Sequence, residues 1–74
     1  MFTKNEEKNM KKIVKLLSKK MYGLTIEEIS SRLKISRITA SKYLSVLVVL
    51  EKVTVREVGK AKIHYLKEYF GGKN

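Results

Sequence analysis

A run of side chains that can bind nucleic acid follows Ser36 in the middle of the chain. The run combines hydrogen-bond donors, cations and an apolar group, and its members are Ser36, Arg37, Ile38, Thr39, Ser41, Lys42 and Tyr43. Arg37 can donate two parallel hydrogen bonds to guanine, Ile38 can contact a thymine methyl group, and the hydroxyl groups can bind bases or phosphates. We expect Lys42 and Tyr43, which come later, to contact phosphates. A helix N-terminus at Ser36 would also favour a nearby phosphate.

A second group of cations, Arg56, Lys60 and Lys62, lies nearer the C-terminus and is expected to reach the DNA backbone or the minor groove. Residues 32–62 contain eight basic residues against two acidic ones. The whole chain has 17 Lys and Arg against 7 Asp and Glu, a formal net charge of +10. Such a field favours a polyanionic partner, with nucleic acid preferred over an anionic membrane surface. A solvated surface is the alternative interpretation of each residue taken singly.

The residue types that catalysis and metal binding require are scarce. The chain has no Cys and a single histidine, His64, without a nearby carboxylate in a recognisable arrangement. Gly71 and Gly72 stand in the C-terminal tail, where they cannot form a phosphate-binding loop between a strand and a helix. We therefore expect no enzymatic activity, no metal and no cofactor, and no small-molecule effector site is evident. His64 is expected to be structural.

An amphipathic helix is predicted from about residue 5 to residue 20. Its apolar residues, among them Met10, Ile13 and Leu17, recur at spacings of three and four, while lysines fill many of the remaining positions. The stripe fits a monomer core most economically. As an alternative, Met10, Ile13 and Leu17 form a subunit contact, which makes them candidates for a homodimer interface.

Two more helices are predicted, and a very short turn separates them. Thr25 and the glutamate three residues later match a capping box that begins a helix over residues 26–33. Ser36 is a good N-cap for a third helix over residues 37–50. The β-branched run at residues 46–49 also fits a strand, but a strand there would leave the preceding segment with no face to bury.

A β-hairpin is predicted over residues 53–66, with a two-residue loop that begins at Gly59. This register places Glu57 opposite Lys62, a favourable cross-strand pair. Leu24, between the first two helices, can add a very short third strand. The predicted fold is therefore mainly α with a small β-hairpin, in the α+β class.

The whole chain, residues 1–74, is interpreted as one domain whose tail, residues 67–74, is expected to fray. No apolar run is long enough to cross a bilayer, and the N-terminal residues lack the apolar core of a signal peptide. We therefore expect a cytoplasmic protein that has no contact with membranes.

The segment LTIEEISSRLKISRITASKYLSVL, residues 24–47, resembles the helix-turn-helix of bacterial and archaeal winged-helix regulators. The segment VTVREVGKAKIHYL, residues 53–66, resembles their wing. The resemblance depends on Thr25 and Ser36 as caps, on small Ser30 between the two helices, and on the apolar residues Ala40 and Leu44. It implies a winged helix-turn-helix with three helices and a two- to three-stranded antiparallel wing. It also implies that the helix after Ser36 enters the major groove of double-stranded DNA while the wing contacts the backbone or the minor groove.

The sequence departs from the family at two kinds of position. Lys34 in the turn, and Glu51 with Lys52 before the wing, occupy positions where glycine is common and the backbone tends to need an unusual angle. Val48 and Val49 stand where the family carries charged residues. These valines predict an apolar cover, and scattered surface valines are the alternative.

Candidates for this cover are the aromatic residues Tyr69 and Phe70 of the tail, the first helix, or the same surface of a second subunit. A homodimer is expected because regulators of this kind usually bind two half-sites about one helical turn apart. The leading hypothesis is a nucleoid-associated, sequence-specific transcriptional regulator. The alternatives are a non-specific chromatin-like or RNA-binding protein and a winged-helix module for protein–protein assembly.

Overall fold

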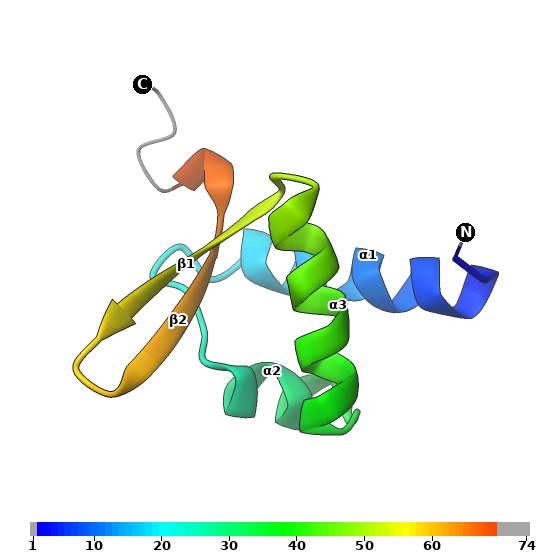
Figure 1. Cartoon of the computed structure of the whole chain (residues 1–74), viewed down its shortest axis with the longest axis horizontal. Helices are drawn as coiled ribbons and strands as arrows, with labels where there is room; N and C mark the ends of the chain where they lie inside the picture. Colours follow the sequence, from blue (N-terminus) through cyan, green and yellow to red (C-terminus); the bar gives the residue numbers. More distant parts are fainter. Residues whose placement is uncertain (1, 70–74) are drawn as a thin grey trace.

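The computed structural model describes residues 2–69 of the 74-residue chain. Within these residues three helices come first: α1 (Lys4–Ser18), α2 (Ile26–Leu33) and α3 (Arg37–Val49). An antiparallel hairpin of β1 (Val53–Val58) and β2 (Ala61–Leu66) follows, and the 3-10 helix η1 (Lys67–Tyr69) ends the described part. The predicted α+β class is confirmed, and the arrangement is winged-helix-like (Figure 1).

The three helices pack around one core, and the hairpin extends away from them to a loop at its far end (Figure 1). Every helix and both strands contribute buried apolar residues, including Ile13, Leu17, Ile29, Leu44, Val53 and Leu66. The stripe of α1 is therefore buried by α3 and the base of the hairpin within a single chain. In the part of the chain that the structure describes, no helix has the length and apolar character needed to cross a membrane.

Helix α1 begins and ends slightly earlier than predicted, because of local hydrogen bonds. Its N-cap is Thr3, whose side chain accepts from the Glu6 amide at 3.1 Å, while the Glu6 carboxylate accepts from the Thr3 amide at 2.9 Å. This capping box fixes the start at Lys4. At the other end, the amide of Lys20 donates to the Leu17 carbonyl, which closes a tight turn beyond Ser18.

The predictions for the next two helices hold closely. Helix α2 spans the predicted residues, and the capping box between Thr25 and Glu28 is formed in both directions, at 2.9 and 3.2 Å. The Ser36 hydroxyl caps α3 by accepting from the Thr39 amide at 3.0 Å. Helix α3 continues to Val49, so the strand alternative for residues 46–49 is wrong. Helical geometry keeps Leu47 buried on the core side of α3.

The backbone is left-handed at both places where winged-helix regulators commonly have glycine. Lys34 ends α2 with φ at 58°, and Glu51 follows α3 with φ at 62°. A left-handed backbone at a residue with a Cβ costs about 1–2 kcal/mol, so the fold tolerates this strain at two turns that set the directions of α3 and the hairpin. The predicted unusual angles are confirmed at these two positions.

The hairpin has the predicted register, with Glu57 opposite Lys62 and Val58 opposite Ala61. Gly59 has φ at 62°, and positive φ at the first loop residue alone fits a type II′ turn. This turn type matches the natural twist of the strands, so the two-residue loop holds the hairpin in register.

A single bridge joins the helical part to the hairpin. Leu24 and His64 exchange backbone hydrogen bonds of 3.0 and 2.8 Å, which makes Leu24 the shortest form of the predicted third strand. Gly23 approaches β2 so closely that an added Cβ would lie 2.8 Å from the His64 carbonyl oxygen. Glycine at this position, with φ at 83°, therefore sets how closely the hairpin lies against the helices.

Candidate nucleic-acid interface

A groove of about 690 Å³ separates α3 from the facing side of the hairpin and opens to solvent. Small or short side chains line it on the helix, and charged and apolar ones line it on the strands: Ser41, Ser45, Val48, Val55, Glu57 and Lys62. Because the helix side carries two hydroxyls, this surface can donate hydrogen bonds to a molecule that enters the groove.

Three cations from two elements meet near the start of α3. Arg37 of α3, Lys60 of the hairpin loop and Lys62 of β2 line one hollow of about 560 Å³. Glu27 is the one carboxylate among its lining residues, so the hollow is basic on balance. Residues far apart in sequence thus form a single place where an anion would be attracted.

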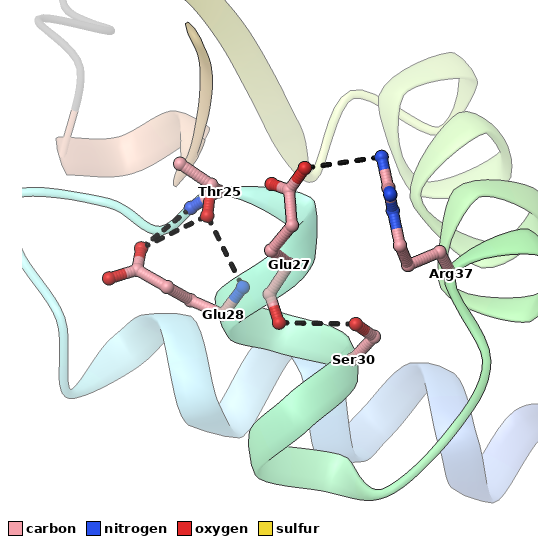
Figure 2. A network of polar contacts seen from close by, with 5 residues as sticks. All are labelled: Thr25, Glu27, Glu28, Ser30 and Arg37. Carbon is pink, nitrogen blue, oxygen red and sulfur yellow. Dashed lines mark hydrogen bonds and ion pairs between the residues drawn. The ribbon is translucent and has the colours of Figure 1, made fainter.

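Arg37 is held by an ion pair across the helix-turn-helix (Figure 2). Its guanidinium lies 3.1 Å from the carboxylate of Glu27, in the first turn of α2, and the two side chains are 67% and 60% exposed. The Ser30 hydroxyl donates to the Glu27 carbonyl at 3.1 Å (Figure 2). An ion pair this exposed contributes about 0–1 kcal/mol, so Arg37 can exchange Glu27 for another anion at little cost.

Lys42 is held by a second ion pair, with the start of α1. Its ammonium lies 3.0 Å from the Glu6 carboxylate. The backbone amide of Thr3, and then Lys42, lower the pKa of Glu6, and Glu6 raises the pKa of Lys42. The Lys42 ammonium also lies 5.7 Å from the centroid of the Tyr43 ring. Lys42 therefore stays charged and is oriented by α1.

The outer side of α3 carries two highly exposed apolar side chains. Ile38 is 84% exposed and Val49 is 79% exposed. Helical spacing places five residues on this side, which we call the α3 ridge: Ile38, Ser41, Lys42, Ser45 and Val49. The first four of these residues offer hydroxyls, one cation and an apolar group, a combination that suits the edges of base pairs, while Val49 is the last residue of α3.

The three cations predicted to contact DNA from the hairpin, Arg56, Lys60 and Lys62, do not all lie on one face of it. Glu57 and Lys62 are paired residues of the register, and both line the groove beside α3. Arg56 is paired with Ile63, and because side chains alternate along a strand, it lies on the opposite face. Lys60 and Lys62 thus lie together beside α3, whereas Arg56 belongs to another surface.

Tyr43 requires a correction. It is 5% exposed and belongs to the core, so its predicted role as a DNA contact is wrong. Tyr43 lies three residues after Ala40 and therefore on the same buried side of α3. The hydroxyls of Ser36 and Thr39 are also engaged locally, at 2.8 Å from one another in the cap of α3. Their contribution is thus to hold the helix start in place.

The residues predicted for a dimer interface differ in their exposure. Met10, Ile13 and Leu17 are at most 8% exposed within one chain, so they form the monomer core and their assignment to a subunit contact is corrected. Val48 is 38% exposed beside the groove, and Val49 is covered by none of the described residues. Of the two aromatic tail candidates, Tyr69 ends η1 and Phe70 lies outside the described residues.

The sequence did not predict three residues of the site, Ser45, Glu6 and Glu27. Ser45 lines the groove, and its spacing of four from Ser41 on the same helix side was a usable signal. Glu6 and Glu27 hold the two cations of α3, but the pair between Glu6 and Lys42 spans 36 residues. A contact this distant in sequence depends on how α1 crosses α3, and no local pattern encodes it.

His64, a residue of β2, contacts Leu24 and has a structural position. It is 7% exposed, and its Nδ1 lies 3.1 Å from the Leu24 carbonyl oxygen. Burial lowers the pKa of His64, and the hydrogen bond with Leu24 opposes this shift in part. The imidazole is therefore neutral near pH 7 and supports the bridge at Leu24.

The chemical capacity of this surface is to bind anions and to donate hydrogen bonds. Within residues 2–69, no three His, Asp or Glu side chains gather where they could hold a metal ion. No protein-family model, curated protein or solved structure matches this chain.

Proposed function

We propose that this chain binds duplex DNA through α3 and the hairpin and acts as a sequence-specific transcriptional regulator. The observation that carries the proposal is the basic hollow in which Arg37 of α3 meets Lys60 and Lys62 of the hairpin. A duplex bound at this hollow would contact both elements at once, with a phosphate on Lys60 and Lys62 and a base edge within reach of Arg37. The phosphate contact would fix the position of the helix relative to the backbone of the duplex.

The α3 ridge supports the second half of the proposal, namely recognition of sequence. The major groove of B-DNA, about 12 Å wide, admits an α-helix, and its base edges present hydrogen-bonding groups and thymine methyls. Ile38 is suited to a methyl group, Ser41 and Ser45 to hydrogen bonds, and Arg37 near the helix start to guanine. Lys42 is suited to a phosphate at the groove edge.

The net charge of +10 supports a strong electrostatic contribution to this binding. A protein that neutralises several phosphates releases their counterions, so its binding constant falls as salt rises, with a log–log slope of about −0.9 per phosphate. We expect a steep slope, because three cations line the hollow and the whole chain carries a net charge of +10.

We extend the proposal to two copies on neighbouring half-sites, about 34 Å apart, and to association with the nucleoid. The exposed Val49 supports a contact between copies, since a large apolar side chain at 79% exposure gains from being covered. Sedimentation of the complex with a one-half-site and a two-half-site duplex tests the extension. Two copies bound independently, without cooperativity, would contradict a homodimer.

The experiment that tests the proposed function is selection of bound duplexes from a random pool, followed by salt titration of the selected and random duplexes. We expect enrichment of a defined sequence and tighter binding to it by about 4 kcal/mol or more at physiological salt. Equal affinity for every duplex at all salt concentrations would contradict sequence recognition and favour non-specific binding. Preference for single-stranded RNA, or no binding to nucleic acid at low salt, would reject the DNA proposal.

A further inference from the structure

An apolar groove of about 440 Å³ lies between α1 and the C-terminal end of α3. Met10 and Val14 of α1 and Leu47 and Leu50 near the end of α3 line it. It shares no lining residue with the groove beside the hairpin, so it is a separate surface. Leu50 is 52% exposed, which leaves apolar area in water that a partner could cover with a gain in free energy.

The rim of this apolar groove is basic. Lys11 and Lys15 of α1 and Lys52 after α3 line it, against the single carboxylate of Glu7. Lys11 and Lys15 are four residues apart, so they lie on the same side of α1 and form one edge of the groove. An apolar floor with cations along its edge is complementary to a ligand that is apolar on one side and acidic beside it.

The apolar groove also has the dimensions of a helix-binding site. The α1 residues that line it run from Glu7 to Ser18, which corresponds to roughly three helical turns, or about 16 Å. A helix of similar length, laid along α1, can place apolar residues at positions i, i+3, i+4 and i+7 against the floor.

We propose that this groove binds an acidic amphipathic helix of a partner protein. The apolar side of that helix covers Leu50 and Val14, and its flanking carboxylates pair with Lys11, Lys15 and Lys52. Because the site lies apart from the DNA surface, the partner and DNA can be bound together. The inference does not depend on the proposed DNA function.

A second copy of this chain is a poorer occupant. In a symmetric contact each residue meets the equivalent surface of its partner, so the lysines of the two rims would be brought close together. The chain has only 7 acidic residues in total to offset them, and like charges across an interface are costly. Charge therefore favours an acidic partner over self-association here.

The test uses the full chain and a labelled helical peptide of about 15 residues, with leucines at i, i+3, i+4 and i+7 and glutamates beside them. Binding is measured by fluorescence anisotropy in about 0.15 M salt, which screens the general field of the protein. We expect saturable binding that Lys11→Glu with Lys15→Glu weakens at least ~10-fold. The matched control, Lys8→Glu with Lys12→Glu, changes the same charge on α1 outside the groove and should alter binding less than ~3-fold.

A second pair of variants tests the apolar floor without disturbing the core. Leu50→Asn should weaken peptide binding, whereas Ile38→Asn, at an 84% exposed position on α3 outside the groove, should leave it unchanged. Circular dichroism checks that each variant is folded. No saturable binding, equal loss with both lysine pairs, or equal binding of a peptide with serines in place of leucines would overturn the proposal. Self-association that Leu50→Asn abolishes would identify a second copy as the occupant and would also overturn it.

Discussion

The cations of α3 and those of the hairpin differ in how the free protein holds them. Arg37 and Lys42 on α3 are each paired with a carboxylate from another helix, at 3.1 and 3.0 Å. Lys60 and Lys62 on the hairpin form no ion pair within residues 2–69. The difference suggests two roles. The helix cations are oriented in the free protein and, in the proposed complex, would exchange a carboxylate for DNA, while the hairpin cations would bind phosphates without such an exchange.

The cations of α3 and of the hairpin can act together only while the hairpin stays beside α3. Gly23→Ala is the substitution expected to displace the hairpin most. The new Cβ would lie 2.8 Å from the His64 carbonyl oxygen, at a residue with φ at 83°. We expect a loss of about 2–3 kcal/mol in the free energy of unfolding, measured by urea denaturation. Binding to DNA should weaken with it, because Lys62 and Arg37 would no longer share one hollow.

Gly59→Ala is the matched control for this prediction. Gly59 also has positive φ, at 62°, but an added Cβ there has no heavy atom within 4 Å. Backbone strain alone should cost about 1–2 kcal/mol, without the added clash that Gly23→Ala introduces. Equal destabilisation by the two substitutions would show that the close approach of Gly23 to β2 is unimportant.

Removal of the hairpin cations is expected to have the next largest effect. Lys60→Ala with Lys62→Ala should weaken binding to all duplexes alike, by about 10-fold at ~0.1 M salt, and reduce the salt slope by about 2. Arg56→Ala, on the opposite hairpin face, serves as the comparison and should have a smaller effect. If Arg56→Ala reduced affinity as strongly as the double variant, the groove side of the hairpin would not be the DNA side.

Removal of the carboxylates that pair with Arg37 and Lys42 should have a smaller effect on the affinity for DNA, and should raise it. Glu27→Gln and Glu6→Gln each remove the carboxylate that competes with DNA for Arg37 or Lys42. Glutamine at position 6 can still accept from the Thr3 amide, so the capping box is kept. We expect affinity to rise by about 2- to 5-fold, because ion pairs near the surface contribute little to stability and their loss should leave the fold intact. Titration of a labelled duplex measures it.

Glu7→Gln is the matched control for these two variants. Glu7 lies in the same turn of α1 and forms no ion pair with the residues that the structure describes. Its neutralisation raises the net charge equally. An equal gain in affinity from Glu7→Gln would mean that net charge, and not release of Arg37 or Lys42, explains the change.

The smallest expected effect is the contribution of His64 to the pH dependence of the free energy of unfolding. His64 supports the hairpin at Leu24. Burial lowers the pKa of His64 in the folded state, so the unfolded chain takes up the proton first. The free energy of unfolding should therefore decrease as pH falls from about 6.5 towards the folded-state pKa. His64→Gln should remove this part of the dependence in urea denaturation at several pH values. An unchanged dependence in that variant would assign it to other groups.

Local signals predicted much of this fold. The capping box at Thr25, the cap at Ser36 and the hairpin register around Gly59 depend on residues a few positions apart, and the structure contains all three. The predictions failed where the answer depended on packing between distant elements. Tyr43 has a polar end but lies on the buried side of α3, and the pairing of Lys42 depends on the position of α1.

We propose that α3 recognises bases, whereas the cations of the hairpin supply affinity for any duplex. The most direct test measures the binding of Arg37→Ala and Lys60→Ala to one selected duplex and one random duplex at a fixed salt concentration. We expect Arg37→Ala to lower the preference for the selected duplex by about 1–3 kcal/mol and to retain weak binding. Lys60→Ala should weaken both duplexes equally. Unchanged preference in Arg37→Ala, or loss of preference in Lys60→Ala, would contradict this division of roles.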